Sequence, residues 1–511
     1  MRCRANSPTP NNHPNRTERG ANRALSRRKS MTIAAAAAAA LLSHAPMPAD
    51  AEAPIQTAPA AGLAAAPAPA APPPFKLINH DESYAYLADP AKRTSTWSKF
   101  KYVPVGGEGS PVWASFGGEL RFRAEHRDNE RFGRGPQDTG GDFQTRARLW
   151  GELNLGSSLR AFVDVQDART SGLASGEPVI EESRTDLHQA FLEAKTGLGA
   201  GTLRVRAGRQ EFGQGGFRLF DMREGANARV ALDMVRVMYD SPTGWSGGAF
   251  AGYALREGKA SWDDATNFDY RLYGATAAKT LGQGATAPKL ELLYANTDRL
   301  VTPFDGQVAG RDDRDTLSVR LSGKVAPWDY EVEAVKQWGS FRDLDIDAWF
   351  FSAVGGRTFS SVKWSPRVAV RLDVGSGDKD PNDCKLNSFN PLFPQPAALR
   401  TDLGFANMVL LQPEVTVRPT PKLTLGANTA GLWRQSKDDG LYALSGMVLR
   451  GANEGQSSYV GWRTGVFARY ALTPHVSLMG VANYTKAGDF LKETGTAEDL
   501  SYLGTFLTFR F

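Results

Sequence analysis

The chain ends on Y-L-G-T-F-L-T-F-R-F, residues 502–511, and this closing stretch decides the fold. Successive side chains of a β-strand point to opposite faces, so Leu503, Leu507 and Phe511 share one apolar face. Arg510 lies on the other face, together with small and polar residues. The chain therefore finishes on a two-faced strand whose apolar side continues to the last residue.

The same alternation continues upstream through most of the chain after residue 112. Leu120 and Phe122 face one way, whereas their neighbours Arg121 and Arg123 face the other. Charges on one face of nearly every strand cannot point into a dry core, because an unpaired buried charge is too costly. In a transmembrane barrel these charges face water and the apolar side chains face lipid. The alternation favours a barrel over the alternative, a soluble sheet, and the closing strand resembles the sorting signal of bacterial outer-membrane barrels.

We expect an all-β fold, a transmembrane antiparallel β-barrel of about 18 strands, since single-chain bacterial barrels have an even number. The expected strands begin near residues 112, 142, 158, 187, 203, 229, 245, 268, 288, 313, 328, 346, 360, 402, 422, 458, 475 and 499. Both chain ends are then periplasmic. A barrel of this size encloses an aqueous lumen rather than a filled core, so the fold predicts transport.

The connections predict which end of the barrel faces which compartment. Short turns at 241–244, 326–328 and 420–422 are expected on the periplasmic side. We expect four longer inserts to form extracellular loops or plugs, at residues 133–142, 170–186, 375–401 and 436–457.

The N-terminal region has the features of an export signal. Arg27, Arg28 and Lys29 precede the apolar run 31–42, and the A-x-A text at 49–51 supplies a cleavage site, so we expect export by the Sec route. We expect four parts along the chain: residues 1–51 as a signal peptide with an N-terminal extension, 52–74 as a disordered Ala/Pro-rich linker, 75–110 as a periplasmic N-terminal segment, and 111–511 as the barrel.

Composition and charge exclude other classes of protein. The mean hydropathy is −0.37, and no run of about 20 apolar residues exists that could form a membrane helix. The whole chain carries a net charge of +5, but residues 1–51 hold eight Lys/Arg against two acidic residues, a net of +6, which leaves −1 for the rest. The basic balance therefore belongs to the signal and gives no indication of nucleic-acid binding.

Five stretches of sequence, taken in order, carry a family resemblance. They are G-G-E-L-R-F-R at 117–123, D-L-H-Q-A-F at 186–191, G-R-Q-E at 208–211, R-E-G-A-N at 223–227, and G-D-K-D-P-N-D at 377–383 with S-F-N-P-L-F-P at 388–394. Together they resemble the alginate-export family of bacterial outer-membrane β-barrel proteins, over roughly residues 95–511. The resemblance implies an 18-stranded barrel of a Gram-negative outer membrane, whose narrow arginine-lined pore passes a polyuronate outward.

Arginines on the expected lumen faces carry the functional hypothesis. Arginine is always charged and can hold a carboxylate through two parallel hydrogen bonds. Alternatively, these arginines pair with lumenal carboxylates in a girdle that holds the barrel's shape. The residues expected to line the pore and bind substrate are Arg121, Arg123, Arg146, Arg148, Arg204, Arg206, Arg209, Glu211, Arg223, Asp233, Arg236, Arg367, Arg371 and Arg463. Arg271, Arg320 and Arg469 are placed on the same face, and the constriction is expected at Arg209, Glu211, Arg223, Asp233 and Arg236.

Three functions follow from these patterns. The first is an outer-membrane channel for passive export of an anionic, alginate-like polysaccharide. The second is a general or small-solute porin, anion-leaning, that takes up acidic nutrients. The third, an outer-membrane enzyme, has only the G-x-S-x-G text at 244–248, which falls on a hairpin turn instead of the strand–turn–helix that a nucleophile needs. We expect no catalytic residue, no metal and no cofactor.

The expected partners follow from the barrel and from the resemblance. They are outer-membrane lipid and lipopolysaccharide, the anionic polysaccharide, and periplasmic proteins of an export complex, with no nucleic acid and a monomeric barrel. The stretch 378–383 resembles the start of a calcium loop, but Asp383 stands where such a loop has Gly and Phe389 where it has Glu. A turn rich in Asp, Asn and Pro is expected here, and calcium binding stays open.

Overall fold

The computed structural model describes residues 75–511, apart from 138–139, 174–175, 177, 215, 217, 285, 303–307 and 394–402. The signal peptide and linker expected for residues 1–74 lie outside the described residues. Within the described part, no helix is long and apolar enough to cross a membrane.

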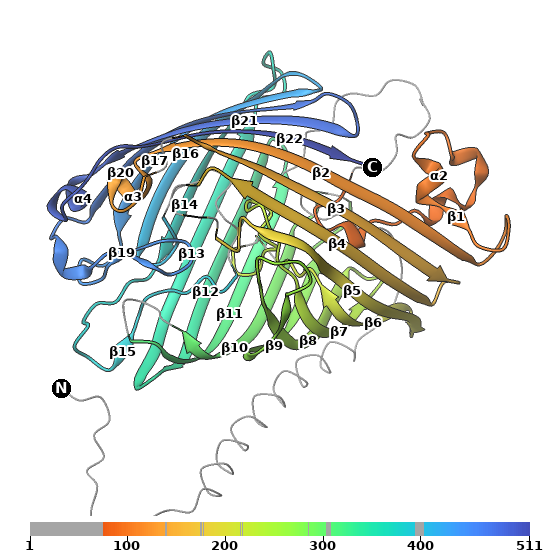
Figure 1. The fold of residues 1–511 in the computed structure, drawn as a ribbon, viewed down its shortest axis with the longest axis horizontal. Coiled ribbons are helices and arrows are strands. Elements are labelled where there is room, and N and C mark those ends of the chain that lie inside the picture. The colour runs from red at the N-terminus through yellow and green to blue at the C-terminus, as the bar shows by residue number, and fades with distance from the viewer. Residues whose placement is uncertain are drawn as a thin grey trace, which may run out of the picture.

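Eighteen long strands form one closed, antiparallel barrel (Figure 1). They are β2 (Val112–Asp128), β3 (Asp142–Leu155), β4 (Leu159–Ser171), β5 (Ser183–Leu198), β6 (Gly201–Gln210), β7 (Leu232–Asp240), β8 (Trp245–Arg256), β9 (Ala265–Thr280), β10 (Lys289–Thr302), β11 (Gly310–Val325), β12 (Trp328–Phe341), β13 (Leu344–Thr358), β14 (Arg367–Gly375), β16 (Met408–Thr420), β17 (Leu423–Arg434), β20 (Tyr459–Ala471), β21 (Val476–Ala487) and β22 (Leu500–Arg510). The expected fold and strand number are confirmed.

The outer surface of the barrel carries a belt of apolar side chains, and much of the inner surface is polar, as the alternation predicts. Leu149, Leu192 and Leu503 point outward with 62, 68 and 57% of their surface exposed. On the strand of Leu149, β3, Arg146 and Arg148 point inward and are buried. Large apolar side chains exposed on all sides of one barrel are stable only where lipid covers them.

The closing strand β22 pairs with the first long strand, β2, and so removes the open edges of the sheet. The register runs from Glu119 opposite Arg510 to Asp128 opposite Ser501 without a shift. Beyond the strand, the Phe511 backbone N–H donates to the Gly118 carbonyl at 3.1 Å. The apolar ending of the chain therefore completes the lipid-facing wall.

The two ends of the barrel differ in the length of their connections. Turns of a few residues at 241–244, 326–327 and 421–422 lie at the same end as Phe511 and the start of β2, as expected for the periplasmic side. At the opposite end lie the longer connections, whose described residues include 129–137, 140–141, 211–214, 216, 218–231, 376–393, 403–407, 435–458 and 488–499.

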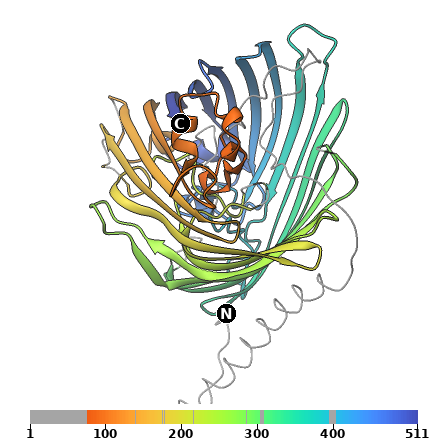
Figure 2. The ribbon, with the colours of Figure 1, turned by 90° about the vertical axis from the view of Figure 1, so that its right-hand side faces the viewer.

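Short elements decorate both ends. Before the barrel come η1 (Asn79–Asp81), η2 (Ala85–Ala88), η3 (Pro90–Lys92), α2 (Ser98–Lys101) and β1 (Val103–Pro104), and Figure 2 shows this orange segment across the barrel opening. At the extracellular end come α3 (Glu130–Gly133), β15 (Lys385–Leu386), β18 (Leu441–Tyr442), β19 (Val448–Arg450), η4 (Ala452–Glu454) and α4 (Asp489–Glu493).

An apolar cluster closes the extracellular end on the side of β16 to β22, and we call it the extracellular cap. Loop residues Phe132, Leu449 and Phe490 pack there against Leu432 and Ala487 of the wall, and all five are buried. The cap places a dry layer directly above the polar inner surface of these strands.

Candidate functional site

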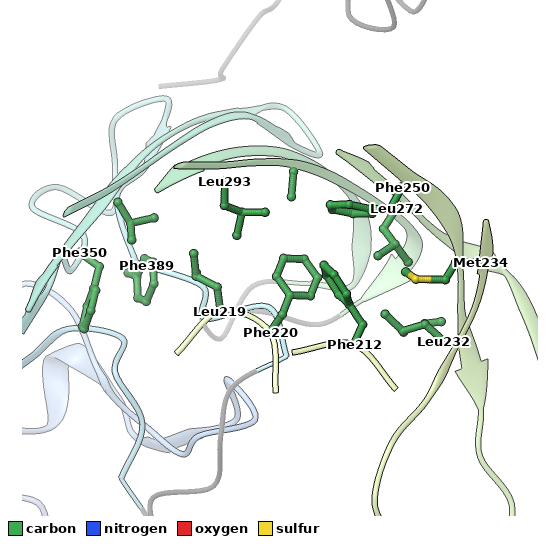
Figure 3. Packing of buried hydrophobic residues seen from close by; sticks show 13 residues of the cluster. Phe212, Leu219, Phe220, Leu232, Met234, Phe250, Leu272, Leu293, Phe350 and Phe389 are labelled. Atoms are coloured by element: carbon green, nitrogen blue, oxygen red, sulfur yellow. The ribbon is translucent and has the colours of Figure 1, made fainter. Parts of the chain in front are cut away.

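One connection does not stay at the rim but enters the barrel. We call residues 211–231, between β6 and β7, the lumenal loop. Its side chains Phe212 and Phe220 are buried and pack against the inward residues Met234 and Phe250 of β7 and β8 (Figure 3). The apolar contact fixes the loop to the wall well inside the barrel, because removing these rings from water is favourable.

A second loop, residues 376–393, meets the lumenal loop inside the barrel. The Asp221 N–H donates to the Phe393 carbonyl at 2.8 Å, and the Phe393 N–H donates to the Leu219 carbonyl at 2.9 Å. Phe389 stacks on Phe350 of β13 with ring centroids 4.9 Å apart. The two loops therefore brace each other across the lumen as one plug.

Arg229 is the polar anchor of the lumenal loop. Its guanidinium donates to both carboxylate oxygens of Glu211 at 2.6 and 2.8 Å and also pairs with Glu224. Burial raises the pKa of Glu211, but Arg148 and Arg229 outweigh this effect and hold that pKa well below its usual range. Glu211 is therefore ionised and locked to the loop's own arginine.

The wall that faces this loop is formed by β2 to β6, and we call its inner surface the paired wall. Arg146 pairs with Glu119 at 2.6 Å and with Glu224 of the loop at 3.1 Å. Arg148 lies 3.0 Å from Glu211. The inward arginines of this wall with such partners include Arg121, Arg123, Arg127, Arg146, Arg148, Arg160 and Arg206.

These ion pairs hold structure in place. Arg121 donates to the Glu224 carbonyl at 3.0 Å, and Arg123 donates to the Gly225 carbonyl at 2.8 Å. A buried guanidinium that already has its carboxylate and carbonyl partners is not free to hold a passing anion. Removing one member of such a pair leaves an uncompensated charge and costs about 3–5 kcal/mol.

The N-terminal segment fills the periplasmic side of the same half of the barrel. Asn79 donates to Asp164 of β4 at 2.9 Å, and the His80 ring lies 2.6 Å from the Gln189 amide oxygen on β5. Burial, followed by the nearby Arg206, lowers the pKa of His80 to about 3. His80 is therefore neutral at physiological pH, and its neutral form is the one that docks.

The opposite wall, formed by β14, β16, β17, β20 and β21, has few ion pairs, and we call it the sparsely paired wall. Arg371 pairs with its strand neighbour Asp373. Arg463 has only the neutral amide of Gln412 as its hydrogen-bond partner, and Arg469 has only the sulfur of Met479. Among the described residues, no carboxylate lies within 4.0 Å of either guanidinium.

The predicted pore residues fall into several groups. Glu211 and Arg223 lie in the lumenal loop, where Arg223 pairs with Glu257 at 2.7 Å. Arg236 points inward and lies over the Phe212 ring at 4.9 Å, with no carboxylate within 4.0 Å in the described part of the chain. Near the periplasmic end, two further inward arginines have carboxylate partners: Arg204 pairs with Asp240, and Arg367 pairs with Asp329.

The expected lumenal position of Arg209 and Asp233 is wrong. They pair with each other at 2.9 Å, but they alternate with inward, buried residues, so they lie on the outer side of the wall. Arg271 shares this outer position, where it pairs with Asp298. Arg209 and Asp233 each stand three residues from an inward arginine of their own strand, Arg206 or Arg236, so a strict period of 2 places them on the opposite face. The five-residue constriction is therefore split between two faces and a loop.

The lumenal loop itself is the feature that alternation did not reveal. Arg218 reaches across to Glu333 of β12 at 3.3 Å, and Arg229, Glu224 and Asn227 make further polar contacts of the loop. The R-E-G-A-N stretch at 223–227 contains the signal: two charges and a Gly in a segment without strand alternation.

One acidic group could hold a metal ion. Oxygen atoms of Asp186, Asp263 and Asp264 all lie within 4.8 Å of one another. Asp186 already accepts hydrogen bonds from the backbone N–H groups of Asp263 and Asp264 at 2.9 and 3.2 Å. These contacts explain the cluster as a loop anchor.

The stretch 378–383 forms a series of turns. Asp378, Asp380 and Asp383 each accept a hydrogen bond from a backbone N–H two residues on. Burial raises the pKa of Asp378 to about 6. Each of these Asp side chains therefore has the role that is usual for Asp in a turn.

A closed 18-stranded barrel with a lipid-facing belt and a polar lumen defines the class of outer-membrane channels. The sequence matches the alginate export family over residues 112–503, more than half of the chain. The chain belongs to this family, as its motifs indicated, and it is a transport protein of the cell outer membrane, in contact with lipid. A comparison with curated proteins found no matching relative.

Several solved structures share the fold. Pseudomonas aeruginosa OccK2 (OpdF), solved in complex with glucuronate, is 11% identical with a TM-score of 0.51, covering 78% of this chain and 96% of that chain. P. aeruginosa OpdK, solved with vanillate, is 11% identical with a TM-score of 0.52, covering 78% and 98%. P. aeruginosa OccD3 (OpdP) is 12% identical with a TM-score of 0.51, covering 81% and 93%. At such identities the likeness concerns the fold alone.

Proposed function

We propose that this protein is a passive export channel for an anionic polysaccharide, an alginate-like polyuronate. Family membership supports a polysaccharide cargo. The observation that carries the proposal is a set of inward guanidinium groups that have no carboxylate within 4.0 Å among the described residues: Arg236, Arg463 and Arg469. Such groups can exchange one weak carboxylate contact for the next, which is what conduction of a polyanion requires.

The described conformation is a closed form of such a channel. The lumenal loop, the loop 376–393 and the N-terminal segment all occupy the barrel interior. A polymer can pass only when part of this material moves aside. Two of the three arginines, Arg463 and Arg469, lie on the sparsely paired wall, whereas Arg236 lies on β7 beside the lumenal loop. We therefore place the polymer path along the sparsely paired wall.

The test is planar-bilayer conductance of the refolded protein, with an added oligouronate and with a neutral oligosaccharide of equal length. We expect anion selectivity and a reversible block by the oligouronate only. Cation selectivity, or equal indifference to both sugars, would contradict the proposal.

A second candidate function is uptake of small acidic nutrients. It is favoured by the shared fold with channels that were solved with glucuronate and with vanillate. The two functions differ in their dependence on chain length. An export channel for a polymer should bind a long oligouronate more tightly than the monomer, whereas a nutrient channel should prefer the monomer.

The remaining partners are part of the same proposal. A barrel closed by its own β2–β22 pairing needs no second copy, so we propose a monomer. The periplasmic mouth, which the N-terminal segment covers, is the surface where proteins of an export complex would deliver the polymer.

A further inference from the structure

The sparsely paired wall holds a compact group of inward polar side chains directly below the extracellular cap. Arg463 of β20 lies opposite Thr485 of β21, and Gly465 lies opposite both Asn428 of β17 and Asn483 of β21. One row closer to the extracellular end, the wall belongs to the cap. The four side chains therefore surround one small area, which we call the amide subsite.

The amide subsite is short of hydrogen-bond partners. Asn428, Asn483, Arg463 and Thr485 are at most 5% exposed. Both amide atoms of each asparagine, the Arg463 Nε and the Thr485 hydroxyl have no partner in the described part of the chain. A direct bond between the two amides would satisfy one atom of each and leave the other two unpaired. Buried polar groups in native proteins are nearly always satisfied, so a group left open needs an explanation.

Glycine at position 465 provides the clearance. A Cβ atom built there would overlap the Asn483 amide oxygen and lie 3.3 Å from that of Asn428. Because the backbone at Gly465 lies between the two amides, any side chain would separate them. Because Gly465 has no side chain, the amides of Asn428 and Asn483 can both reach the same point.

We infer that the amide subsite binds one acidic sugar unit of the transported polymer, its hydroxyl groups on Asn428 and Asn483 and its carboxylate on Arg463. An amide offers both a donor and an acceptor, which matches a pair of adjacent sugar hydroxyls. A guanidinium without a carboxylate partner matches the carboxylate. The inference rests on the proposed function, and it adds that the channel selects sugar acids over other anions.

The subsite lies beneath the cap, so it is engaged when the cap loosens. A sugar unit bound there would satisfy polar atoms that the closed form leaves unpaired. Binding of the polymer would therefore favour the open form, because a ligand shifts a conformational equilibrium toward the state that it binds more tightly.

The test compares Asn428→Ala and Asn483→Ala with the unchanged channel, in planar bilayers, for block by an oligouronate and for chloride-over-potassium selectivity. We expect each substitution to raise the half-blocking concentration about tenfold while the inorganic selectivity is unchanged. The matched control is Asn154→Ala, an inward amide on β3 that donates to Glu152 at 3.0 Å, which should leave the block unchanged.

The outcomes separate this inference from the proposed function. If the unchanged channel ignores oligouronate, both fail. If it is blocked, but the two variants are blocked equally well, the amide subsite is wrong and the proposed function stands. Gly465→Ala gives an independent check, because a Cβ there must displace Asn483, and it should weaken the block without removing any polar group. Heat-modifiability on gels verifies that each variant has folded as a barrel.

Discussion

The two inner walls of this barrel use the same residue in opposite ways. On the paired wall, Arg146 and Arg148 are each bound to carboxylates of the wall and of the lumenal loop. On the sparsely paired wall, the hydrogen bonds that Arg463 and Arg469 make within the described part of the chain go to neutral groups, Gln412 and Met479. The count of arginines therefore says little about a pore; their partners decide whether a cation holds the protein together or remains available to a solute.

The largest effect is expected at the centre of the paired network. Arg229→Met removes the cation that joins Glu211 and Glu224 within the lumenal loop and leaves them with wall arginines such as Arg148 and Arg146, which should destabilise the docked fold of the loop by about 3–5 kcal/mol. The single-channel conductance should rise as the loop leaves the lumen. An unchanged conductance would show that the network does not hold the loop.

The apolar anchor should come next. Phe220→Ala removes a fully buried ring that packs against Phe212, Phe250 and Phe393. We expect a loss of about 3 kcal/mol in loop docking, at the low end for such a substitution because lumenal water can enter the space. Conductance noise from loop opening should increase, and the barrel itself should remain heat-modifiable. If the conductance and its noise are unchanged in Phe220→Ala, this apolar contact does not hold the loop in place.

Acid should release the N-terminal segment. The pKa of His80 is about 3 when docked, below its ordinary value of 6.5, so docking is complete above pH 6.5 and is lost progressively as the pH falls toward 3. Between pH 7 and pH 5 the loss amounts to about 2 kcal/mol. Conductance measured at both pH values should rise at pH 5.

The control for this acid response is His80→Gln, which keeps a polar side chain and cannot titrate in this range. Its conductance should lose most of the difference between pH 7 and pH 5. If the His80→Gln channel keeps the full conductance difference between pH 7 and pH 5, groups other than His80 control the opening of the periplasmic mouth.

The smallest effect is expected on the exposed side of the barrel. Arg169 pairs with Asp167 at 2.8 Å, but its side chain is 59% exposed. Arg169→Ala should leave both the thermal stability of the barrel and its conductance unchanged, because a solvent-exposed ion pair contributes little. A larger effect of Arg169→Ala would mean that an exposed ion pair matters as much as the buried ion pairs of the paired wall, which would contradict the role assigned to burial.

The sequence predicts what depends on local alternation and misses what depends on distant contacts. The expected strand starts at 112, 142, 245 and 328 coincide with the observed β2, β3, β8 and β12. These strands are specified by the residues themselves, one face for lipid and one for water.

The candidate site was harder to predict, for a physical reason. That Arg229 binds Glu211 while Arg463 has no carboxylate depends on how loops fold back through the lumen. Arg209 and Asp233, by contrast, lie within β6 and β7, three residues from the inward Arg206 and Arg236, and a strict period of 2 places them on the outer face, as observed. A period of 2 holds within a strand and carries no information about a segment that leaves the sheet.

The most direct test of the account compares reversal potentials in a salt gradient for two matched variants. Arg463→Gln and Arg469→Gln together remove the available cations of the sparsely paired wall, and Arg146→Gln removes a paired cation from the opposite wall. We predict that the double variant loses anion selectivity and block by oligouronate, whereas any open Arg146→Gln channel keeps both. Equal loss in the two variants, or none in the double variant, would contradict the assignment of the path to the sparsely paired wall.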